Sequence, residues 1–369
     1  MRERSIKPES IKRVVVRGAN WVGDAAMTVP ALRELRRVLP GAHIALATRP
    51  WAEGIFEGAD FIDELLPLGG KSKGASALLA QAREFRRRRF DLALLLPNAF
   101  APALAAFAAR VPLRVGYATD GRRALLTHPL PAPTWRGQRH EVFYYLNLVA
   151  ELERLLHGRA TAGAGEPRAE PEPRAELAVS DERRRAARAL LRETGAREEL
   201  PLVALCPGST NSRAKRWPAE RFAAVADMLC ARDGAQVVLV GAAEERDVTE
   251  EVARRMTHRP LILTGRTSLA ETAAVLAAAD LLVTNDTGPA HLAAAVGCPV
   301  VVIFGPTNPV TTRPFSESAE VVRRPPDCAP CMLRDCPIDH RCMTAITPEE
   351  VYARASGVVA RARRFEVAR

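Results

Sequence analysis

The stretch LLVTNDTGPAHLAAAVGCPVVVIF, residues 281–304, decides the fold of this chain. Two apolar runs within it, 281–284 and 300–304, have the length and composition of buried strands. The polar segment 285–291 ends the first strand and opens a short helix over 292–296. A strand that passes through a polar loop into a helix and back to a strand is the repeating unit of a parallel α/β sheet.

The polar segment has the chemistry of an anion site. Asp286 or Thr287 can cap the helix, and Pro289 suits its first turn, where a missing N–H costs nothing. Gly288 lets another group approach the backbone closely. Free N–H groups and the helix dipole favour a phosphate at that end. Ligands of open α/β sheets bind where strands end, so we expect a ligand here.

The same alternation runs along the rest of the chain. Strands are predicted at 14–16, 44–47, 91–96, 203–206, 237–240 and 261–263, and helices at 30–39, 75–88, 141–156, 219–231 and 268–279. Residues 158–173 are rich in Gly, Ala, Pro and Glu and are predicted to be a linker. We expect an α/β protein of two doubly wound domains facing a central cleft. The predicted parts are an N-terminal domain 1–157, a linker 158–176, a C-terminal domain 177–346 and a closing helix 347–369.

Charge is distributed unevenly. Residues 1–150 hold 23 Lys and Arg against 13 Asp and Glu, whereas residues 151–369 hold 30 of each. The basic part suggests an anionic partner, such as a membrane surface, a phosphorylated lipid or nucleic acid, although a solvated arginine-rich surface would look the same. Aromatic residues are only 5% of the chain, which argues against a surface that stacks bases.

The first residues, the most apolar stretch and the cysteine count together predict the cellular compartment. Residues 1–10 are polar and charged, so we expect no secretory signal, and 96–111 is too interrupted for a membrane span. Seven cysteines, an odd number, suit a reducing compartment better than a set of disulfides. A cytoplasmic location is therefore expected.

Two loops are candidates for chemistry. In RGANWVGD, residues 17–24, glycines allow a tight loop, and Asp24 is either a helix cap or a general base for an attacking hydroxyl. In PGSTNSRAKRW, residues 207–217, hydroxyls, backbone amides and Lys215 can hold a diphosphate, although Lys215 could simply be solvated.

Three further features are less specific. Glu244 follows another strand and could bind ribose hydroxyls or merely begin a helix. His291 is either a structural histidine or a donor to a leaving phosphate. Four cysteines of the late loop could hold Zn²⁺ or an iron–sulfur cluster, although their spacing matches neither a paired zinc knuckle nor a ferredoxin run, and reduced thiols in a packed loop are the alternative; they are Cys328, Cys331, Cys336 and Cys342.

The motifs GD, PGS, KRWP and NDTGPAH, in this order, resemble the ADP-heptose lipopolysaccharide heptosyltransferases of glycosyltransferase family 9. The segments RGANWVGDAAMTVPAL and CAPCMLRDCPIDHRCM look most like the heptosyltransferase II branch. The resemblance spans nearly the whole chain apart from the linker and the termini.

This resemblance implies a GT-B fold and an inverting transfer without a catalytic metal. Asp24 matches the catalytic base of the family. The residues that match its donor-binding motifs are Ser209, Thr210, Lys215, Glu244, Asp286, Thr287, Gly288 and His291. Glu244 matches less securely because Glu245 is adjacent.

The resemblance also implies the partners. These are an ADP-heptose donor, a lipid A-linked inner-core acceptor and the inner face of the cytoplasmic membrane, where the protein would be peripheral. Candidate contacts to the acceptor are Arg122, Arg123, Arg136 and Arg139. A relative with another acceptor or nucleotide sugar, or a non-catalytic protein that binds acidic lipid or nucleic acid, is the alternative.

Overall fold

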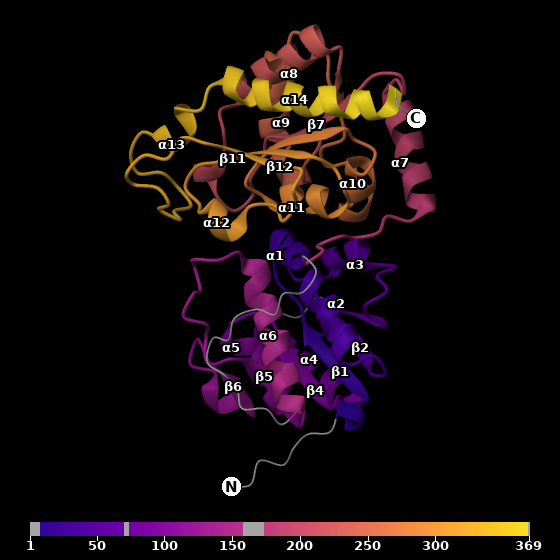
Figure 1. The fold of residues 1–369 in the computed structure, drawn as a ribbon, viewed down its shortest axis with the longest axis vertical. Helices are drawn as coiled ribbons and strands as arrows, with labels where there is room; N and C mark the ends of the chain where they lie inside the picture. The colour runs from indigo at the N-terminus through magenta and orange to yellow at the C-terminus, as the bar shows by residue number, and fades with distance from the viewer. Residues whose placement is uncertain (1–7, 70–73, 158–172, 368–369) are drawn as a thin grey trace. The chain divides into compact units, whose positions relative to one another are not determined.

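The computed structural model describes residues 8–69, 74–157 and 173–367 (Figure 1). The chain divides into two compact units, an N-terminal unit, Met1–Ala175, and a C-terminal unit, Glu176–Arg369. Most of the predicted linker, 158–172, lies outside the described residues. Each unit is built on its own six-stranded parallel sheet.

The N-terminal unit has strands in the order β3-β2-β1-β4-β5-β6. They are β1 (Arg13–Arg17), β2 (His43–Thr48), β3 (Glu64–Pro67), β4 (Leu92–Leu95), β5 (Leu113–Tyr117) and β6 (His128–Leu130). Its helices are α1 (Val22–Met27), α2 (Val29–Val38), α3 (Pro50–Phe56), α4 (Ala75–Arg88), α5 (Phe100–Ala108) and α6 (Glu141–Leu156). Short 3₁₀ turns occur at Pro8–Ser10 and Arg123–Leu125.

The C-terminal unit has strands in the order β12-β11-β10-β7-β8-β9. They are β7 (Leu202–Cys206), β8 (Gln236–Leu239), β9 (Leu261–Ile262), β10 (Leu281–Asn285), β11 (Val300–Phe304) and β12 (Ala319–Arg323). Its helices are α7 (Asp181–Thr194), α8 (Ala219–Asp233), α9 (Arg246–Arg255), α10 (Leu269–Leu276), α11 (Gly288–Ala295), α12 (Pro309–Thr312), α13 (Arg341–Thr344) and α14 (Pro348–Val367). Two 3₁₀ turns lie at Arg213–Lys215 and Ala243–Glu245.

The two sheets have the same topology. Numbered from the first strand of each unit, both follow the order 3-2-1-4-5-6 of a doubly wound dinucleotide-binding fold. The strand order reverses between β1 and β4 in the N-terminal unit and between β7 and β10 in the C-terminal unit. Since ligands of such sheets bind beyond the carboxyl ends of strands at this reversal, each unit offers one expected site.

Burial explains why the apolar runs form strands. β10 and β11 are buried along their whole length, as continuous apolar runs in a parallel sheet should be. Trp217 anchors the core of the C-terminal unit: it is 1% exposed, its ring lies 5.1 Å from that of Phe222, and its Nε1 donates to the carbonyl of Ile346 at 3.2 Å. Within the described residues, no helix is both long and apolar enough to cross a membrane.

The predicted elements are confirmed with small shifts at their ends. The helices predicted at 75–88 and 141–156 have those bounds, as does the strand at 300–304. One boundary is wrong in a way that matters: α11 begins at Gly288 rather than at 292, so the segment from Gly288 to His291 is its first turn.

Candidate functional site

Asp24 lies in the first turn of α1, directly beyond the carboxyl end of β1. The helix begins at Val22, and its N-cap is Trp21, which makes no capping bond through its side chain. Asp24 is therefore not the N-cap of this helix, which was one of the two roles that the sequence allowed. It is half-buried, and its carbonyl accepts the N–H of Thr28 at 3.0 Å.

A second carboxyl group lies in the surroundings of Asp24. Burial raises the pKa of Glu141 above its ordinary value; Arg136 opposes that shift and the charge of Asp24 adds to it. Burial likewise raises the pKa of Tyr145 well above 10.0, with the charges of Asp24 and Glu141 adding to the shift. The first turn of α6, which packs on α1, thus lies within electrostatic reach of Asp24. No motif in the sequence identified Glu141 or Tyr145.

In the C-terminal unit the structure brings two predicted donor residues into direct contact. The Nζ of Lys215 lies 2.8 Å from Oδ2 and 3.1 Å from the carbonyl oxygen of Asp286. The hydroxyl of Thr307 donates to the same Oδ2 at 2.7 Å. Asp286 is 3% exposed, so its carboxylate is a buried anchor that holds the lysine at the end of β10.

Asn285, the last residue of β10, joins the two loops of this site. Its side-chain oxygen accepts the N–H of Trp217 at 3.0 Å, and its side-chain nitrogen donates to the carbonyl of Pro207 at 2.7 Å. The amide is 0% exposed. It therefore fixes both ends of the loop 207–217 against β10, a role that the sequence did not reveal.

Glu244 and Glu245 differ sharply. Glu244 is exposed, whereas Glu245 is 6% exposed and accepts from the hydroxyl of Thr210 at 3.2 Å and from the N–H of Ala242 at 3.0 Å. A Cβ added to Gly208 would lie 2.3 Å from Cδ of Glu245. The buried side chain of Glu245 thus supports the loop 207–217. Of the two glutamates, only Glu244 is accessible to a ligand, as its predicted contact with the ribose requires.

The other predicted donor residues surround the same strand end. Ser209 is 3% exposed, and its carbonyl accepts two N–H groups of Arg216, at 3.1 and 3.2 Å. Thr287 is the N-cap of α11 without a side-chain capping bond, and Gly288 is the first residue of that helix. His291 lies one turn into α11 and is 6% exposed.

The loop that carries the four cysteines, residues 328–342, is hydrogen-bonded to the loop 207–217 that carries Lys215. The carbonyl of Arg334 accepts the N–H of Ala214 at 2.9 Å and the hydroxyl of Ser212 at 3.2 Å. Nε2 of His340 lies 2.6 Å from the carbonyl oxygen of Ala214. The N–H and the carbonyl of Ala214, the residue before Lys215, are therefore both bonded to the cysteine-containing loop.

The cysteines of that loop gather without forming a metal site. Burial raises the pKa of Cys342 to about 11, and the other three cysteines add to the shift, so all four lie within electrostatic range. Cys342 is buried and belongs to the core of the unit, whereas Cys328 is exposed. In the described part of the chain, no three His, Cys, Asp or Glu side chains are placed to hold one metal ion. The cysteines in this arrangement do not fit zinc or an iron–sulfur cluster.

Arg122 is not a surface residue. It is 0% exposed, its Nε donates to the carbonyl of Tyr117 at 2.8 Å, and its Nη1 donates to the carbonyl of Pro97. The structure thus corrects its expected place at the acceptor, because its donors are used to hold the loop after β4. Its neighbour Arg123 is exposed.

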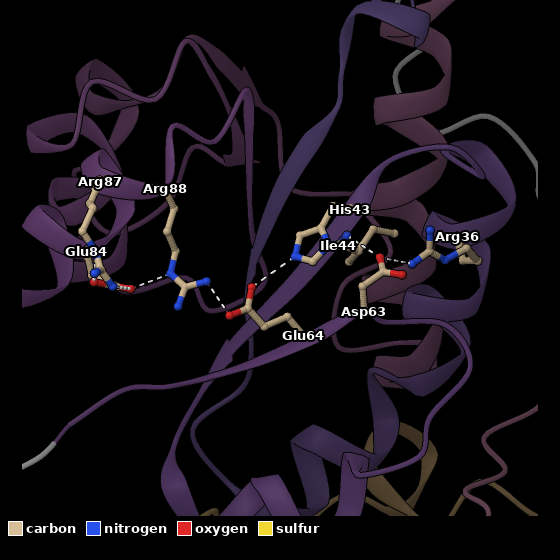
Figure 2. Close-up of polar contacts among 8 residues, drawn as sticks. All are labelled: Arg36, His43, Ile44, Asp63, Glu64, Glu84, Arg87 and Arg88. Carbon is tan, nitrogen blue, oxygen red and sulfur yellow. Dashed lines mark hydrogen bonds and ion pairs between the residues drawn. The ribbon is translucent and has the colours of Figure 1, made fainter.

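The arginines near α6 and those of α4 have different partners. Arg136 stacks on Tyr144 at 4.8 Å, and Arg139 stacks on Phe143 at 4.8 Å, beside the first turn of α6. By contrast, two arginines of α4 are paired with acids, Arg87 with Glu84 in the same helix and Arg88 with Glu64 at the amino end of β3 (Figure 2). Arg88 binds Glu84 and Glu64 there, so its charge is neutralised locally.

The chain is similar in sequence and in structure to known proteins. Residues 78–341 match glycosyltransferase family 9 (heptosyltransferase). The lipopolysaccharide heptosyltransferase 2 of Salmonella typhimurium is 29% identical over 84% of this chain and 88% of its own length. The structure of the ADP-heptose lipopolysaccharide heptosyltransferase II of Escherichia coli superimposes with a TM-score of 0.78, at 26% identity, over 96% of this chain and 100% of that one.

A family 9 glycosyltransferase of Veillonella parvula gives a TM-score of 0.81 at 26% identity, over 95% of this chain and 98% of its own. The family match covers the loops that carry Lys215 and Asp286, and the structural matches cover both sheets. Two doubly wound sheets with these loops are the GT-B architecture of glycosyltransferases. The chain therefore belongs to glycosyltransferase family 9, the heptosyltransferases.

Proposed function

We propose that the chain transfers heptose from ADP-L-glycero-D-manno-heptose to the inner-core heptose of lipopolysaccharide, as its heptosyltransferase 2 relatives are named for doing. The observation that carries the proposal is the assembly at the end of β10. There a buried aspartate holds a lysine beside the first turn of α11, where a diphosphate would be favoured.

Lys215 has the geometry to bind a diphosphate. An ammonium group has three donors, and within the described residues Nζ makes two hydrogen bonds, both to Asp286. The side chain is 27% exposed, so the remaining donor can reach a ligand oxygen. As the bond to the sugar breaks, negative charge grows on ADP, and a pre-positioned cation lowers the energy of that state without reorganisation.

On the acceptor side, Asp24 is proposed as the general base. Its carboxylate would accept the proton of the acceptor hydroxyl while that oxygen attacks the anomeric carbon and ADP departs. A single displacement of this kind inverts the anomeric configuration.

The proposed acceptor is linked to lipid A, which puts the enzyme at the inner face of the cytoplasmic membrane as a peripheral protein. Near α6, the exposed Arg136 and the half-buried Arg139 are the candidates for contact with its anionic groups. Arg123 is also a candidate contact to the acceptor, whereas the buried Arg122 is not.

The test is an incubation of the purified chain with ADP-heptose and lipopolysaccharide acceptors truncated at successive inner-core sugars, read by mass spectrometry. Addition of one heptose only to the acceptor that ends in a single inner-core heptose supports the proposal. Transfer to an acceptor without heptose, or from another nucleotide sugar only, would replace it with another activity of the family.

A further inference from the structure

Asn98, three residues beyond the carboxyl end of β4, has a side-chain donor that the protein does not use. Its Oδ1 accepts from the hydroxyl of Tyr144 at 3.1 Å and from Nη2 of Arg122 at 3.4 Å. Because a guanidinium nitrogen can only donate, the atom that faces Arg122 is the amide oxygen, and Nδ2 is turned away from it. Within the described residues Nδ2 has no acceptor, yet it is not among the buried polar atoms that lack one, so it is open to solvent.

The backbone around Asn98 is held in place as well. Arg122, which is 0% exposed, donates through Nη1 to the carbonyls of Pro97 and Ala99, on both sides of Asn98. Arg122 is itself closely packed, because a Cβ added to Gly116 would lie 3.2 Å from its Nη2. The amide nitrogen is thus positioned before a ligand arrives, which lowers the entropy cost of binding.

The place of Asn98 in the sheet is where a ligand is expected. Asn98 follows β4 and Asp24 follows β1, and these parallel neighbours flank the point at which the strand order of the N-terminal sheet reverses. The N–H of Leu96 donates to the carbonyl of Arg17 at 3.3 Å, so the two strand ends are joined. Ligands of doubly wound sheets bind beyond the strands at this point.

Exposed aromatic side chains follow the same two strands. Trp21 is the N-cap of α1, after β1, and Phe100 is the first residue of α5, after β4; both are exposed. Ligand sites combine aromatic side chains with a few fixed polar groups. This combination suits a sugar ring, which presents C–H groups on its faces and oxygen atoms around its rim.

We propose that Nδ2 of Asn98 donates a hydrogen bond to an uncharged oxygen of the acceptor sugar and so helps to determine which sugar is placed before Asp24. This inference rests on the proposed function for the identity of the acceptor. Tyr144 is then a positioning residue, because its hydroxyl acts on the acceptor only through the amide of Asn98.

The competing explanation is that Asn98 only supports its own loop by accepting from Arg122 and Tyr144. The two explanations depend on different atoms, Oδ1 for loop support and Nδ2 for the acceptor. Asn98→Asp separates them, because aspartate keeps the shape and the accepting oxygen but replaces Nδ2 with an oxygen that has no hydrogen to donate.

The matched control is Asn147→Asp in α6. The Nδ2 of Asn147 donates to the hydroxyl of Tyr117 at 2.9 Å, so the same chemical change and the same added charge fall on a donor that the protein does use. N147D should therefore lower the melting temperature and leave the KM for the acceptor at the wild-type value.

Steady-state kinetics with the truncated acceptor should show the opposite pattern in N98D. The KM for the acceptor should rise about three- to tenfold, the factor that corresponds to a lost hydrogen bond between uncharged groups. The KM for ADP-heptose and the melting temperature should stay at the wild-type values. A wild-type KM for the acceptor in N98D would overturn the proposal, as would a parallel rise of both KM values with a lower melting temperature.

Tyr144→Phe tests the positioning role. Y144F should raise the KM for the acceptor by less than N98D does, without changing the KM for the donor. In the N98D background it should cause no further rise, because the contact that it positions is already lost. Equal rises caused by Y144F in both backgrounds would show that Tyr144 does not act through Asn98.

Failure of this inference can be told from failure of the proposed function. If the wild type transfers heptose to the inner-core acceptor and N98D matches it, only the role of Asn98 is refuted. If the wild type uses another sugar acceptor instead, the proposed function fails. The ratio of the N98D to the wild-type KM for that other acceptor then decides on Asn98: a ratio of about three or more supports the role, and a ratio of about one refutes it.

Discussion

Lys215 and Asp286 form an ion pair of 2.8 Å between the loop after β7 and the end of β10. The pair crosses the point at which the strand order of the C-terminal sheet reverses. Asp286 is almost fully buried and also accepts a bond from Thr307. The lysine is thus placed before any ligand arrives, which is what stabilisation of a departing diphosphate requires.

Removal of this lysine should weaken binding of the nucleotide. Lys215→Ala is expected to reduce the affinity for ADP by about 1.5–3 kcal/mol, because it removes a hydrogen bond to a charged group. Calorimetric titration with ADP measures this, with Arg188→Ala on the exposed face of α7 as the control. Equal affinity in K215A and R188A would exclude Lys215 from the donor site.

The neighbouring glutamates should separate into two roles. Glu245→Ala leaves Thr210 and the N–H of Ala242 without their acceptor, so it should lower the free energy of unfolding by about 1–3 kcal/mol. Glu244→Ala, at an exposed position, should change stability by less than about 0.5 kcal/mol but should weaken ADP binding if it contacts the ribose. Urea unfolding and ADP titration of both variants check this. A stability loss in E244A with none in E245A would invert the assignment.

Two adjacent arginines should behave in opposite ways. Arg122→Ala removes a buried group bonded to several carbonyl oxygens and should cost roughly 3 kcal/mol or more of stability, since several charged hydrogen bonds are lost together. Arg123→Ala should be near neutral for folding. Thermal unfolding of the two variants tests this, and equal melting temperatures would show that the burial of Arg122 is not important for the fold.

The pKa of Glu141 gives a prediction about pH. Because burial raises this pKa above the ordinary 4.5, the folded state favours the protonated form. Its contribution to stability is present below pH 4.5 and is lost as pH rises through the folded-state pKa. Glu141→Gln should therefore match the wild type in acid and become the more stable of the two as the pH rises. Urea unfolding of both proteins across that range is the measurement; a gap that closes with rising pH would mean the opposite shift.

Continuous apolar runs made much of the fold predictable. β10 and β11 are buried on both faces, so their sequences are apolar throughout and could be identified. Four strands were missed. β3, β6 and β12 are partly exposed edge strands, and the first two contain Pro67 and Pro129, whereas the apolar run of β5 is interrupted by Arg114 and Gly116. Such strands carry little pattern.

Parts of the site could be predicted and parts could not. Lys215 and Asp286 were identified as donor residues from their motifs, but their contact depends on which strands are neighbours in the sheet. Glu245 differs from Glu244 only in the direction its side chain takes, which is set by the packing of Gly208. Arg122 and Arg123 are likewise indistinguishable in the sequence, and only tertiary packing buries one of them.

The central claim is that Asp24 is the base of a heptosyl transfer. Asp24→Asn keeps the size of the side chain and removes the proton acceptor. Turnover of ADP-heptose with the truncated lipopolysaccharide acceptor, measured at saturating concentrations of both, should fall about 10²-fold or more, the scale of general base catalysis. Calorimetry should show unchanged affinity for ADP. Turnover within a few-fold of the wild type, with the fold intact, would contradict the claim.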